Sequence, residues 1–237
     1  MDFKTALVSK GQEAGFCFAA SQIEQFETYS KMLLETNKVM NLTAITEPEE
    51  VAVKHMIDSL LVYETKGFSG KTLVDVGTGA GFPGLPLKIY DNTLKVTLID
   101  SLAKRLNFLN QVIEALKLKD ITCAHLRAED AGKEPGLREN FDIAVARAVA
   151  PLPVLAEYCL PLVKVGGCFY AMKGNKYEKE IEDGKRALGI LGGRIKEIKE
   201  VKLPGLEDKR TIIIVEKHKK TPAGYPRKAG IVAKKPL

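Results

Sequence analysis

The sequence predicts an α/β fold: a mostly parallel seven-stranded sheet with an antiparallel hairpin at one edge and a helical extension at the N-terminus. After Gly70, short segments rich in Val, Ile, Leu and aromatic residues alternate with helical stretches. The last two such segments follow one another without a full helix between them. Residues 1–65 instead carry apolar side chains near helical spacing. Strands that alternate with helices form a mostly parallel sheet that helices cover on both faces.

The helical extension is expected to span residues 1–65. Ser21-x-x-Glu24 fits a capping box and predicts the start of one helix. A second helix is expected to begin in Thr46-Glu47-Pro48-Glu49, because Pro suits the first turn of a helix. Residues 37–43, mostly polar with two Asn, are expected to form the loop between them.

The α/β core is expected to span residues 66–217, followed by a basic tail over residues 218–237. The strands are expected at residues 72–76, 95–99, 121–126, 141–146, 167–172, 195–202 and 210–216. The helices between them are expected at residues 85–90, 102–118, 153–160 and 176–191.

The composition is that of a globular chain, with 45% hydrophobic and 28% charged residues. The N-terminus has no basic start followed by an apolar run, and no apolar stretch is long enough for a membrane span, so neither a secretion signal nor a membrane segment is expected. No Cys-x-x-Cys pair is present, which predicts a reducing compartment and no structural metal. The lack of an obvious apolar interface segment favours a monomer.

Positive charge is concentrated at the C-terminus. The net charge is +6, yet residues 217–237 contain seven Lys or Arg and no acid, which leaves about −1 for the first 216 residues. A flexible basic tail attracts polyanions such as nucleic acids. The alternative is a solvated, disordered end, and the charge pattern does not separate the two.

A glycine-rich turn follows the first strand of the core. Asp75-Val76-Gly77-Thr78-Gly79-Ala80-Gly81 runs from a buried-type strand into three alternating glycines. Glycines let the backbone turn sharply and approach a ligand closely. The alternative is an ordinary strand–helix turn, but the glycine spacing at the end of the first strand favours a ligand site.

Two cofactors fit such a turn. Gly79-Ala80-Gly81-Phe82-Pro83-Gly84 also matches a dinucleotide fingerprint. Asp100 ends the second strand, where an acid would hold ribose hydroxyls of either cofactor. Asp75 separates them, because its carboxylate suits the amino acid part of S-adenosylmethionine and would repel a pyrophosphate. Little chain is left for a separate substrate domain, which also argues against a dehydrogenase.

Polar residues at the ends of the next strands support the same cofactor. Glu129 follows the third strand, where an acid can accept a hydrogen bond from an adenine amino group. Arg147 ends the fourth strand, and strand carboxyl ends in an open sheet face the ligand crevice. The alternatives are a helix N-terminal acid for Glu129 and a surface ion pair for Arg147.

The sequence resembles the glucose-inhibited division protein B family, bacterial methyltransferases that modify a guanine N7 of small-subunit ribosomal RNA. The similarity covers most of the chain, and Phe82-Pro83-Gly84 directly after the glycines is its most specific part. The other matching motifs are Asn37-x-x-x-Asn41-Leu42-Thr43, His55-x-x-Asp58-Ser59, Asp75-Val76-Gly77-Thr78-Gly79-Ala80-Gly81, Arg127-Ala128-Glu129, Phe141-Asp142, Arg147-Ala148, Lys173-Gly174, Tyr225-Pro226-Arg227-Lys228-Ala229-Gly230 and Lys234-Lys235-Pro236-Leu237.

The resemblance implies a Rossmann-like class I S-adenosylmethionine-dependent methyltransferase. It also implies a cytoplasmic bacterial enzyme whose substrate is 16S ribosomal RNA, free or in the small ribosomal subunit particle. The cofactor contacts carried over from the family are Gly77, Phe82, Ala128, Glu129 and Arg147. The reasoning on the turn and the strand ends adds Asp75, Gly79 and Asp100 to these cofactor-binding candidates.

No acid–base catalyst is expected, because guanine N7 carries a free lone pair and needs no general base. Alignment of N7, methyl and sulfur is the main demand, and Arg147 is the candidate for positioning. His55 and Asp58 lie three residues apart on a predicted helix and are expected to make a local structural contact or to shape the site. The RNA-binding candidates are Arg147, Lys173, Tyr225, Arg227, Lys228, Lys234 and Lys235.

Three other functions stay open at this point. A small-molecule methyltransferase would share the cofactor site but would have no need of the basic tail. A nicotinamide-dependent oxidoreductase would use the same glycines. A non-enzymatic ribosome-binding protein would keep the fold without the cofactor, which the intact turn argues against.

Overall fold

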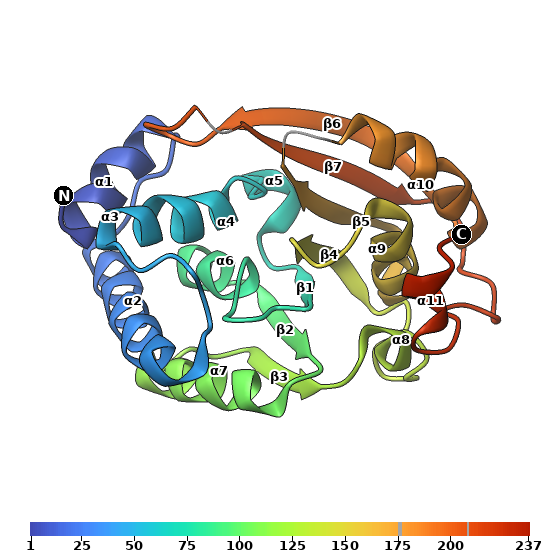
Figure 1. Ribbon diagram of the computed structural model, residues 1–237, viewed down its shortest axis with the longest axis horizontal. Coiled ribbons are helices and arrows are strands. Elements are labelled where there is room, and N and C mark those ends of the chain that lie inside the picture. The colour runs from blue at the N-terminus through green and yellow to red at the C-terminus, as the bar shows by residue number, and fades with distance from the viewer. Residues whose placement is uncertain (175–176, 208) are drawn as a thin grey trace.

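The computed structural model describes residues 1–174, 177–207 and 209–237 and contains a seven-stranded sheet in the order β3-β2-β1-β4-β5-β7-β6 (Figure 1). Five neighbouring strands, from β3 to β5, pair in parallel, and β7 pairs antiparallel with both β5 and β6. The predicted parallel sheet with an antiparallel edge hairpin is therefore confirmed. The strands are β1 (Thr72–Val76), β2 (Lys95–Asp100), β3 (Ile121–His125), β4 (Phe141–Arg147), β5 (Val163–Lys173), β6 (Gly193–Lys202) and β7 (Lys209–Lys217).

Helices cover both faces of this sheet, and each face has its own hydrophobic core. Leu73 of β1 belongs to the core beneath α2, α6 and α7, whereas its neighbour Val74 belongs to the core beneath α8, α9 and α10. This alternation within one strand explains why the strands are apolar on both sides. The helices on the two sides are α2 (Ala20–Met40), α6 (Gly84–Tyr90), α7 (Ala103–Ala115), α8 (Ala128–Ala131), α9 (Leu152–Cys159) and α10 (Glu178–Leu191). Helix α2 packs against α6 and α7.

Most of the remaining helical turns lie near the two ends of the chain (Figure 1), and η2 joins α9 to β5. Near the N-terminus, α3, η1 and α4 form one continuous helical segment, and η1 within it is a π-helix. A π-helical turn is rare and is found mostly at functional sites. None of the helices in the described residues is both long and apolar enough to span a bilayer. The remaining helices are α1 (Phe3–Glu13), α3 (Pro48–Val51), η1 (Ala52–Ile57), α4 (Asp58–Leu60), α5 (Thr65–Phe68), η2 (Leu160–Leu162) and α11 (Ile231–Lys234).

The start and end of α2 differ from the sequence prediction. The helix begins at Ala20, and the amide of Ala19 donates to Gln22 Oε1 at 2.8 Å, so the expected capping box at Ser21 is wrong. The helix then continues to Met40, through half of the expected loop. Asn41 ends it in the left-handed conformation, at φ 51°.

The boundaries of other helices and strands differ by a few residues from those expected from the sequence. Helix α7 ends at Ala115, and Lys117 takes a positive φ of 52° just beyond it, so the helix is shorter than expected. Strand β5 begins at Val163, four residues earlier than expected, across a register shift in its pairing with β4. The helix expected at residues 176–191 corresponds to α10, and its expected first residue, Lys176, lies outside the described residues.

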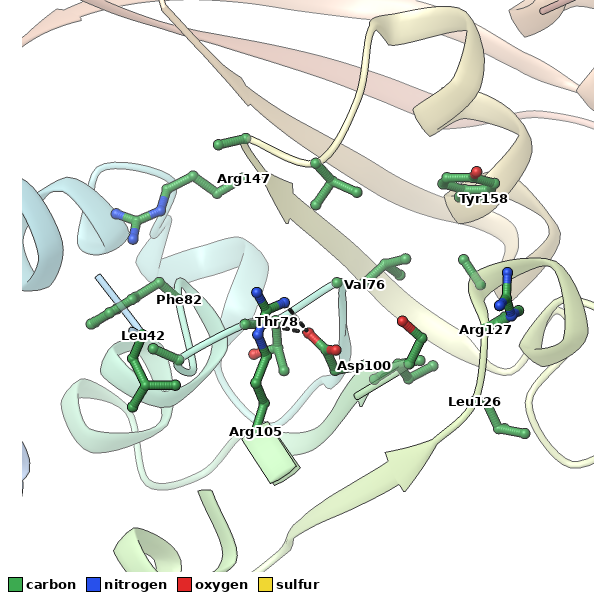
Figure 2. Close-up of a pocket in the computed structure, with 18 of the residues that line it drawn as sticks. Leu42, Val76, Thr78, Phe82, Asp100, Arg105, Leu126, Arg127, Arg147 and Tyr158 are labelled. Atoms are coloured by element: carbon green, nitrogen blue, oxygen red, sulfur yellow. Dashed lines mark hydrogen bonds and ion pairs between the residues drawn. The ribbon is translucent and has the colours of Figure 1, made fainter. Parts of the chain in front are cut away.

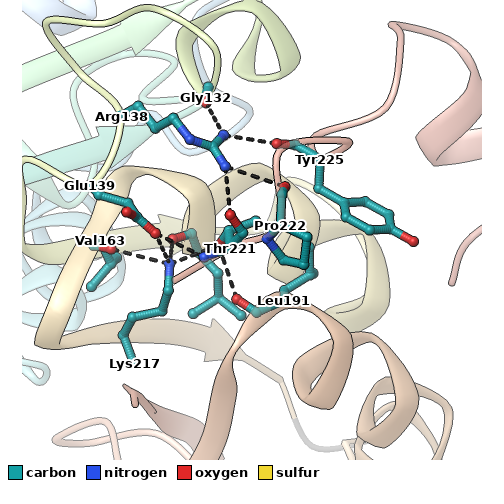
Figure 3. Close-up of polar contacts among 10 residues, drawn as sticks. Gly132, Arg138, Glu139, Val163, Leu191, Lys217, Thr221, Pro222 and Tyr225 are labelled. Atoms are coloured by element: carbon teal, nitrogen blue, oxygen red, sulfur yellow. Dashed lines mark hydrogen bonds and ion pairs between the residues drawn. The ribbon is translucent and has the colours of Figure 1, made fainter. Parts of the chain in front are cut away.

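The C-terminal tail is folded against the core, which contradicts the alternative of a solvated, disordered end. Arg138 donates to the backbone carbonyls of Thr221 and Tyr225, each at 2.8 Å (Figure 3). Glu139 accepts from the Thr221 amide at 2.8 Å, and buried Lys217 donates to the Thr221 hydroxyl at 2.7 Å. Burial lowers the pKa of Lys217 to about 8.

A buried ion pair fixes the tail further along. Glu157 of α9 is fully buried, and Arg227 donates to it from its backbone amide at 2.7 Å and from Nη2 at 2.6 Å. Pro226 lies so close to Gly132, just after α8, that a Cβ on Gly132 would come within 2.8 Å of the proline ring. The tail therefore covers α8 and α9, the two helices beside the carboxyl ends of the central strands (Figure 1).

Candidate active site

A cavity of about 560 Å³ opens at the carboxyl ends of β1, β2 and β4 (Figure 2). Ligand sites for small molecules usually measure about 300–1,000 Å³. Phe82 and Arg147 lie at one end of the cavity, Tyr158 and Arg127 at the other, and Asp100 between them. Seven of the eight predicted cofactor-binding residues line it: Gly77, Gly79, Phe82, Asp100, Ala128, Glu129 and Arg147.

The glycine turn forms the floor of this cavity. Gly77 and Gly79 have φ values of 73° and 61°, in the left-handed region that side chains disfavour. A Cβ on Gly77 would also come within 2.8 Å of the Val149 side chain. Tyr29 of α2 donates its hydroxyl to the carbonyl of Ala80 at 2.5 Å, so the N-terminal extension holds the turn from behind.

Asp75 lies beneath the turn and does not line the cavity. Its Oδ2 accepts hydrogen bonds from the Thr78 hydroxyl at 2.7 Å and from the Gly84 amide at 2.8 Å. Its Oδ1 is buried and has no hydrogen-bond partner among the described residues. Burial raises the pKa of Asp75 to about 6, because water no longer stabilises the charged form. The carboxylate thus leaves unused acceptor capacity directly under the cavity floor.

Asp100 ends β2 and faces the middle of the cavity (Figure 2). Its carboxylate accepts from the amides of Gly79 and Leu102, each at 2.9 Å, and from Arg105 at 3.3 Å. These bonds fix both oxygens at the strand end. An acid in this place can receive hydrogen bonds from the hydroxyls of a ribose.

The other end of the cavity is formed by the first residues of α8 and by α9. Ala128 and Glu129 open α8, and Glu129 is buried. Tyr158 of α9 lies beside it, and the pKa of Tyr158 is raised by burial and by the negative charge of Glu129. An acid and an aromatic ring at one end of a cavity suit the amino group and the face of a purine.

Arg147 at the end of β4 is held on three sides. Its Nη1 donates to Asp58 Oδ2 at 2.8 Å, and its Nη2 donates to His55 Nδ1 at 3.3 Å. Its guanidinium carbon lies 4.8 Å from the centre of the Phe82 ring, within the range of a cation–π contact. His55 and Asp58 therefore meet through Arg147 and not only through the helix that carries them.

The surroundings of His55 fix its proton. A guanidinium can only donate, so Nδ1 accepts from Arg147 and the ring proton lies on Nε2. Nε2 is 2.7 Å from the Thr43 hydroxyl. The ring stacks on Phe82 with centroids 4.5 Å apart. Burial, and then the charge of Arg147, lower the pKa of His55 to about 3, so the imidazole stays neutral.

Several cavity residues were not singled out from the sequence as cofactor contacts. They are Leu42, Thr43, Arg105, Arg127 and Tyr158. Leu42 and Thr43 reach the cavity because Asn37 bonds to both the amide and the carbonyl of Thr43, at 2.8 Å and 2.9 Å. The spacing Asn37-x-x-x-Asn41-Leu42-Thr43 was visible in the sequence, but nothing in it indicated which cavity the segment would reach.

The predicted RNA-binding residues fall into three groups. Arg147 and Lys173 end the neighbouring strands β4 and β5, but only Arg147 lines this cavity. Tyr225 and Arg227 are held in the folded tail by backbone and ion-pair contacts. The third group, Lys228, Lys234 and Lys235, has exposed side chains in the tail.

The sheet order, with a cavity at the strand ends, is the fold found in solved S-adenosylmethionine-dependent methyltransferases. Among solved structures, the chain is similar to a SAM-dependent methyltransferase from Aquifex aeolicus, with a TM-score of 0.54, 18% identity, and coverage of 74% of this chain and 96% of the other. It is also similar to M. jannaschii TYW2 in complex with AdoMet, with a TM-score of 0.52, 15% identity, and coverage of 85% and 78%. At these identities the similarity supports the fold alone.

The family follows from the sequence comparisons. The model of the GidB family, rRNA small subunit methyltransferase G, matches residues 22–213. Ribosomal RNA small subunit methyltransferase G of Acetivibrio thermocellus is 56% identical over 91% of this chain and 89% of its own length. The protein of the same name from Alkaliphilus metalliredigens is 50% identical over 100% of both chains. The chain belongs to the rRNA small subunit methyltransferase G family, which does not favour the small-molecule alternative.

Proposed function

We propose that this chain transfers a methyl group from S-adenosylmethionine to N7 of a guanine in bacterial 16S ribosomal RNA. The names of its relatives support a small-subunit ribosomal RNA substrate. The observation that supports N7 as the methyl acceptor is the neutral His55 beside Arg147, at the end of the cavity that Phe82 and Arg147 form. A histidine whose pKa is about 3 is a poor proton acceptor. Such a site suits a nucleophile that already has a free lone pair.

The residues of the cavity fit the parts of the cofactor. When bound, S-adenosylmethionine supplies an electrophilic methyl group on its sulfonium. Asp100 would accept from the ribose hydroxyls, and Glu129 from the adenine amino group. Gly77 and Gly79 let the amino acid part approach the backbone, and Asp75 provides a negative charge under it. We propose these residues, with Phe82, Ala128 and Arg147, as the cofactor-binding set.

The role of this chain in the reaction is mainly to orient the acceptor. Arg147 is restrained by Asp58 and by the Phe82 ring, so its guanidinium is fixed before any substrate arrives. A fixed donor at the end of β4 can hold the guanine or its neighbouring phosphate in line with the methyl group. We propose that Arg147 positions the acceptor and that no residue removes a proton from it.

The tail supplies most of the proposed surface for the rest of the RNA. Lys173, which is 9% exposed and paired with Glu180, stays a proposed contact at the end of β5. Lys228, Lys234 and Lys235 are exposed, and within the described part of the chain they form no ion pair. Tyr225 and Arg227 lie beside them in the folded tail. The RNA would be met as free 16S ribosomal RNA or as the small ribosomal subunit particle, in the cytoplasm, by a monomer.

Mass spectrometry of 16S ribosomal RNA tests the proposal. RNA from cells that lack the gene is expected to lose a single 7-methylguanosine, and purified enzyme with labelled S-adenosylmethionine is expected to restore it. Free RNA and the small subunit particle, offered side by side, identify the preferred substrate. A loss at another base atom, or no loss at all, would contradict the proposal.

A further inference from the structure

A second cavity, of about 620 Å³, opens beside the cofactor cavity. The two share four lining residues, His55, Arg147, Ala148 and Val149, which lie between them. The second cavity extends away from the glycine turn toward the antiparallel edge of the sheet, where Arg210 is the second residue of β7 and Lys173 ends β5. It does not include the turn, Asp100 or Glu129. Its wall is therefore distinct from the part of the site proposed for the cofactor.

One buried carboxylate in this cavity holds two guanidinium groups. Asp58 Oδ2 accepts from Arg147 Nη1 at 2.8 Å, and Asp58 Oδ1 accepts from Arg210 Nε at 2.9 Å. The Asp58 side chain is only 5% exposed, whereas 25% of the Arg210 side chain faces solvent. Because a single negative charge faces two positive ones, the three residues keep a net positive charge on the cavity wall.

The other charged groups of the cavity are already balanced in pairs. Lys173 forms an ion pair with Glu180 at 2.6 Å, and its side chain is 9% exposed. Lys54 pairs with Glu50 at 2.5 Å. Among the described residues of this cavity, the net positive charge therefore lies at the group formed by Asp58, Arg147 and Arg210. A guanidinium that is pre-positioned by a carboxylate loses little freedom when it binds a further anion.

We propose that Arg210, held next to Arg147 by Asp58, binds a backbone phosphate of the RNA strand that carries the target guanine. This inference rests on the proposed function, because it assigns the acceptor strand to the second cavity. Guanidinium groups suit phosphate oxygens, with which they form charge-assisted hydrogen bonds. Arg147 then belongs to both cavities and lies where the acceptor strand meets the methyl donor, while Arg210 acts on the acceptor strand alone.

The test compares Arg210→Gln with Arg194→Gln. Arg194 lies at the other end of the same β6–β7 hairpin and also pairs with a carboxylate, Glu216, at 2.7 Å. Binding of 16S ribosomal RNA is measured over a range of salt concentrations, with S-adenosylmethionine affinity and thermal unfolding measured in parallel. For Arg210→Gln we expect the RNA affinity to fall roughly tenfold and the salt slope to decrease by about one. Arg194→Gln should change neither.

Arg210→Lys keeps the charge but not the planar fork. It should restore the salt slope and only part of the affinity, which a purely structural role of Arg210 would not produce. It also keeps the interaction with Asp58 if Arg210→Gln proves unstable. Unchanged RNA affinity and slope in Arg210→Gln would overturn the inference, as would an equal loss of S-adenosylmethionine affinity. Failure of the proposed function is a separate result, namely wild-type enzyme that transfers no methyl group to 16S RNA.

Discussion

His55 carries the ring proton on Nε2 and accepts from Arg147 on Nδ1, and this arrangement decides its chemistry. Its pKa falls from the ordinary 6.5 to about 3, so the folded protein prefers the neutral ring. The resulting stability is fully present above the unfolded pKa of about 6.5. It is lost progressively as the pH falls from there toward 3. At neutral pH the residue therefore serves as a rigid support for Phe82 and Arg147.

The His55→Ala variant should lower the methylation rate without changing the shape of the pH–rate profile. Loss of the ring contact to Arg147 misplaces the acceptor, and misplacement of this kind costs roughly 10- to 100-fold. The measurement is the rate of methyl transfer between pH 5.5 and 9 for both proteins. A limb near pH 6.5 that the wild type has and the variant lacks would mean that His55 exchanges protons in the reaction.

Some residues of the site could be read from the sequence and some could not. Gly77, Gly79 and Asp100 were predictable because their role depends on the end of one strand and the spacing after it. Arg210 was not, because its partner Asp58 lies 152 residues away along the chain. Nothing in a local pattern indicates that a helix near the N-terminus meets the start of the last strand.

The tail acts as an element of the fold through its contacts with α8 and α9. Arg227 is the ion-pair partner of Glu157, which is fully buried. A buried carboxylate that loses its partner destabilises the folded state strongly. This role of the tail in the packing of the helices that form the cofactor cavity is independent of any attraction for RNA.

Replacing Arg227 with Ala should lower the free energy of unfolding by about 2–3 kcal/mol, a value below that for fully buried pairs because Arg227 is partly exposed. In thermal unfolding this corresponds to a fall in Tm of roughly 4–12 °C for a chain of this size. Lys228→Ala, at the exposed neighbouring position, is the control and should change Tm little. The second variant, Glu157→Gln with Arg227→Met, should recover part of the loss. Equal Tm values for Arg227→Ala and Lys228→Ala would contradict the role of the ion pair.

The elements themselves were largely predictable, and the boundaries were less so. Strong apolar segments predicted six of the strands, because buried strands need little beyond their own composition. The seventh, β6, was predicted from a weaker apolar pattern and is largely exposed. The extension of α2 to Met40 was missed because its last turn is polar and its end depends on Asn41 in a left-handed conformation. The folding of the tail was missed because its anchors, Arg138 and Glu157, belong to other parts of the chain.

At the scale of the whole molecule, charge and cavity lie on neighbouring surfaces. Residues 217–237 carry seven basic residues and no acid, and this segment packs against the helices that border the cofactor cavity. Two of these charges, Lys217 and Arg227, are used in contacts with Glu139 and Glu157. The surplus available to RNA is therefore smaller than the sequence suggests, and it is fixed in place.

A triple variant of the three exposed lysines nearest the C-terminus, Lys228, Lys234 and Lys235, each changed to Gln, tests this distribution. RNA affinity should fall and the salt slope should decrease by up to about three, because each lost phosphate contact removes nearly one unit. S-adenosylmethionine affinity and Tm should stay at the wild-type values, since the three side chains are exposed. A wild-type salt slope in the triple variant would place the RNA on another face of the molecule.

The cofactor cavity is lined by residues from both parts of the chain. Leu42, Thr43 and His55 belong to the N-terminal extension, and the glycine turn belongs to the core. A ligand in this cavity binds only a chain in which the N-terminal extension is packed against the core. By mass action, ligand at 100 times its Kd adds about 2.7 kcal/mol to the stability of that docked form. The methyl donor is thus a folding ligand as well as a reagent. We expect the N-terminal helices to be most open to proteolysis in cells that are short of the compound the enzyme consumes.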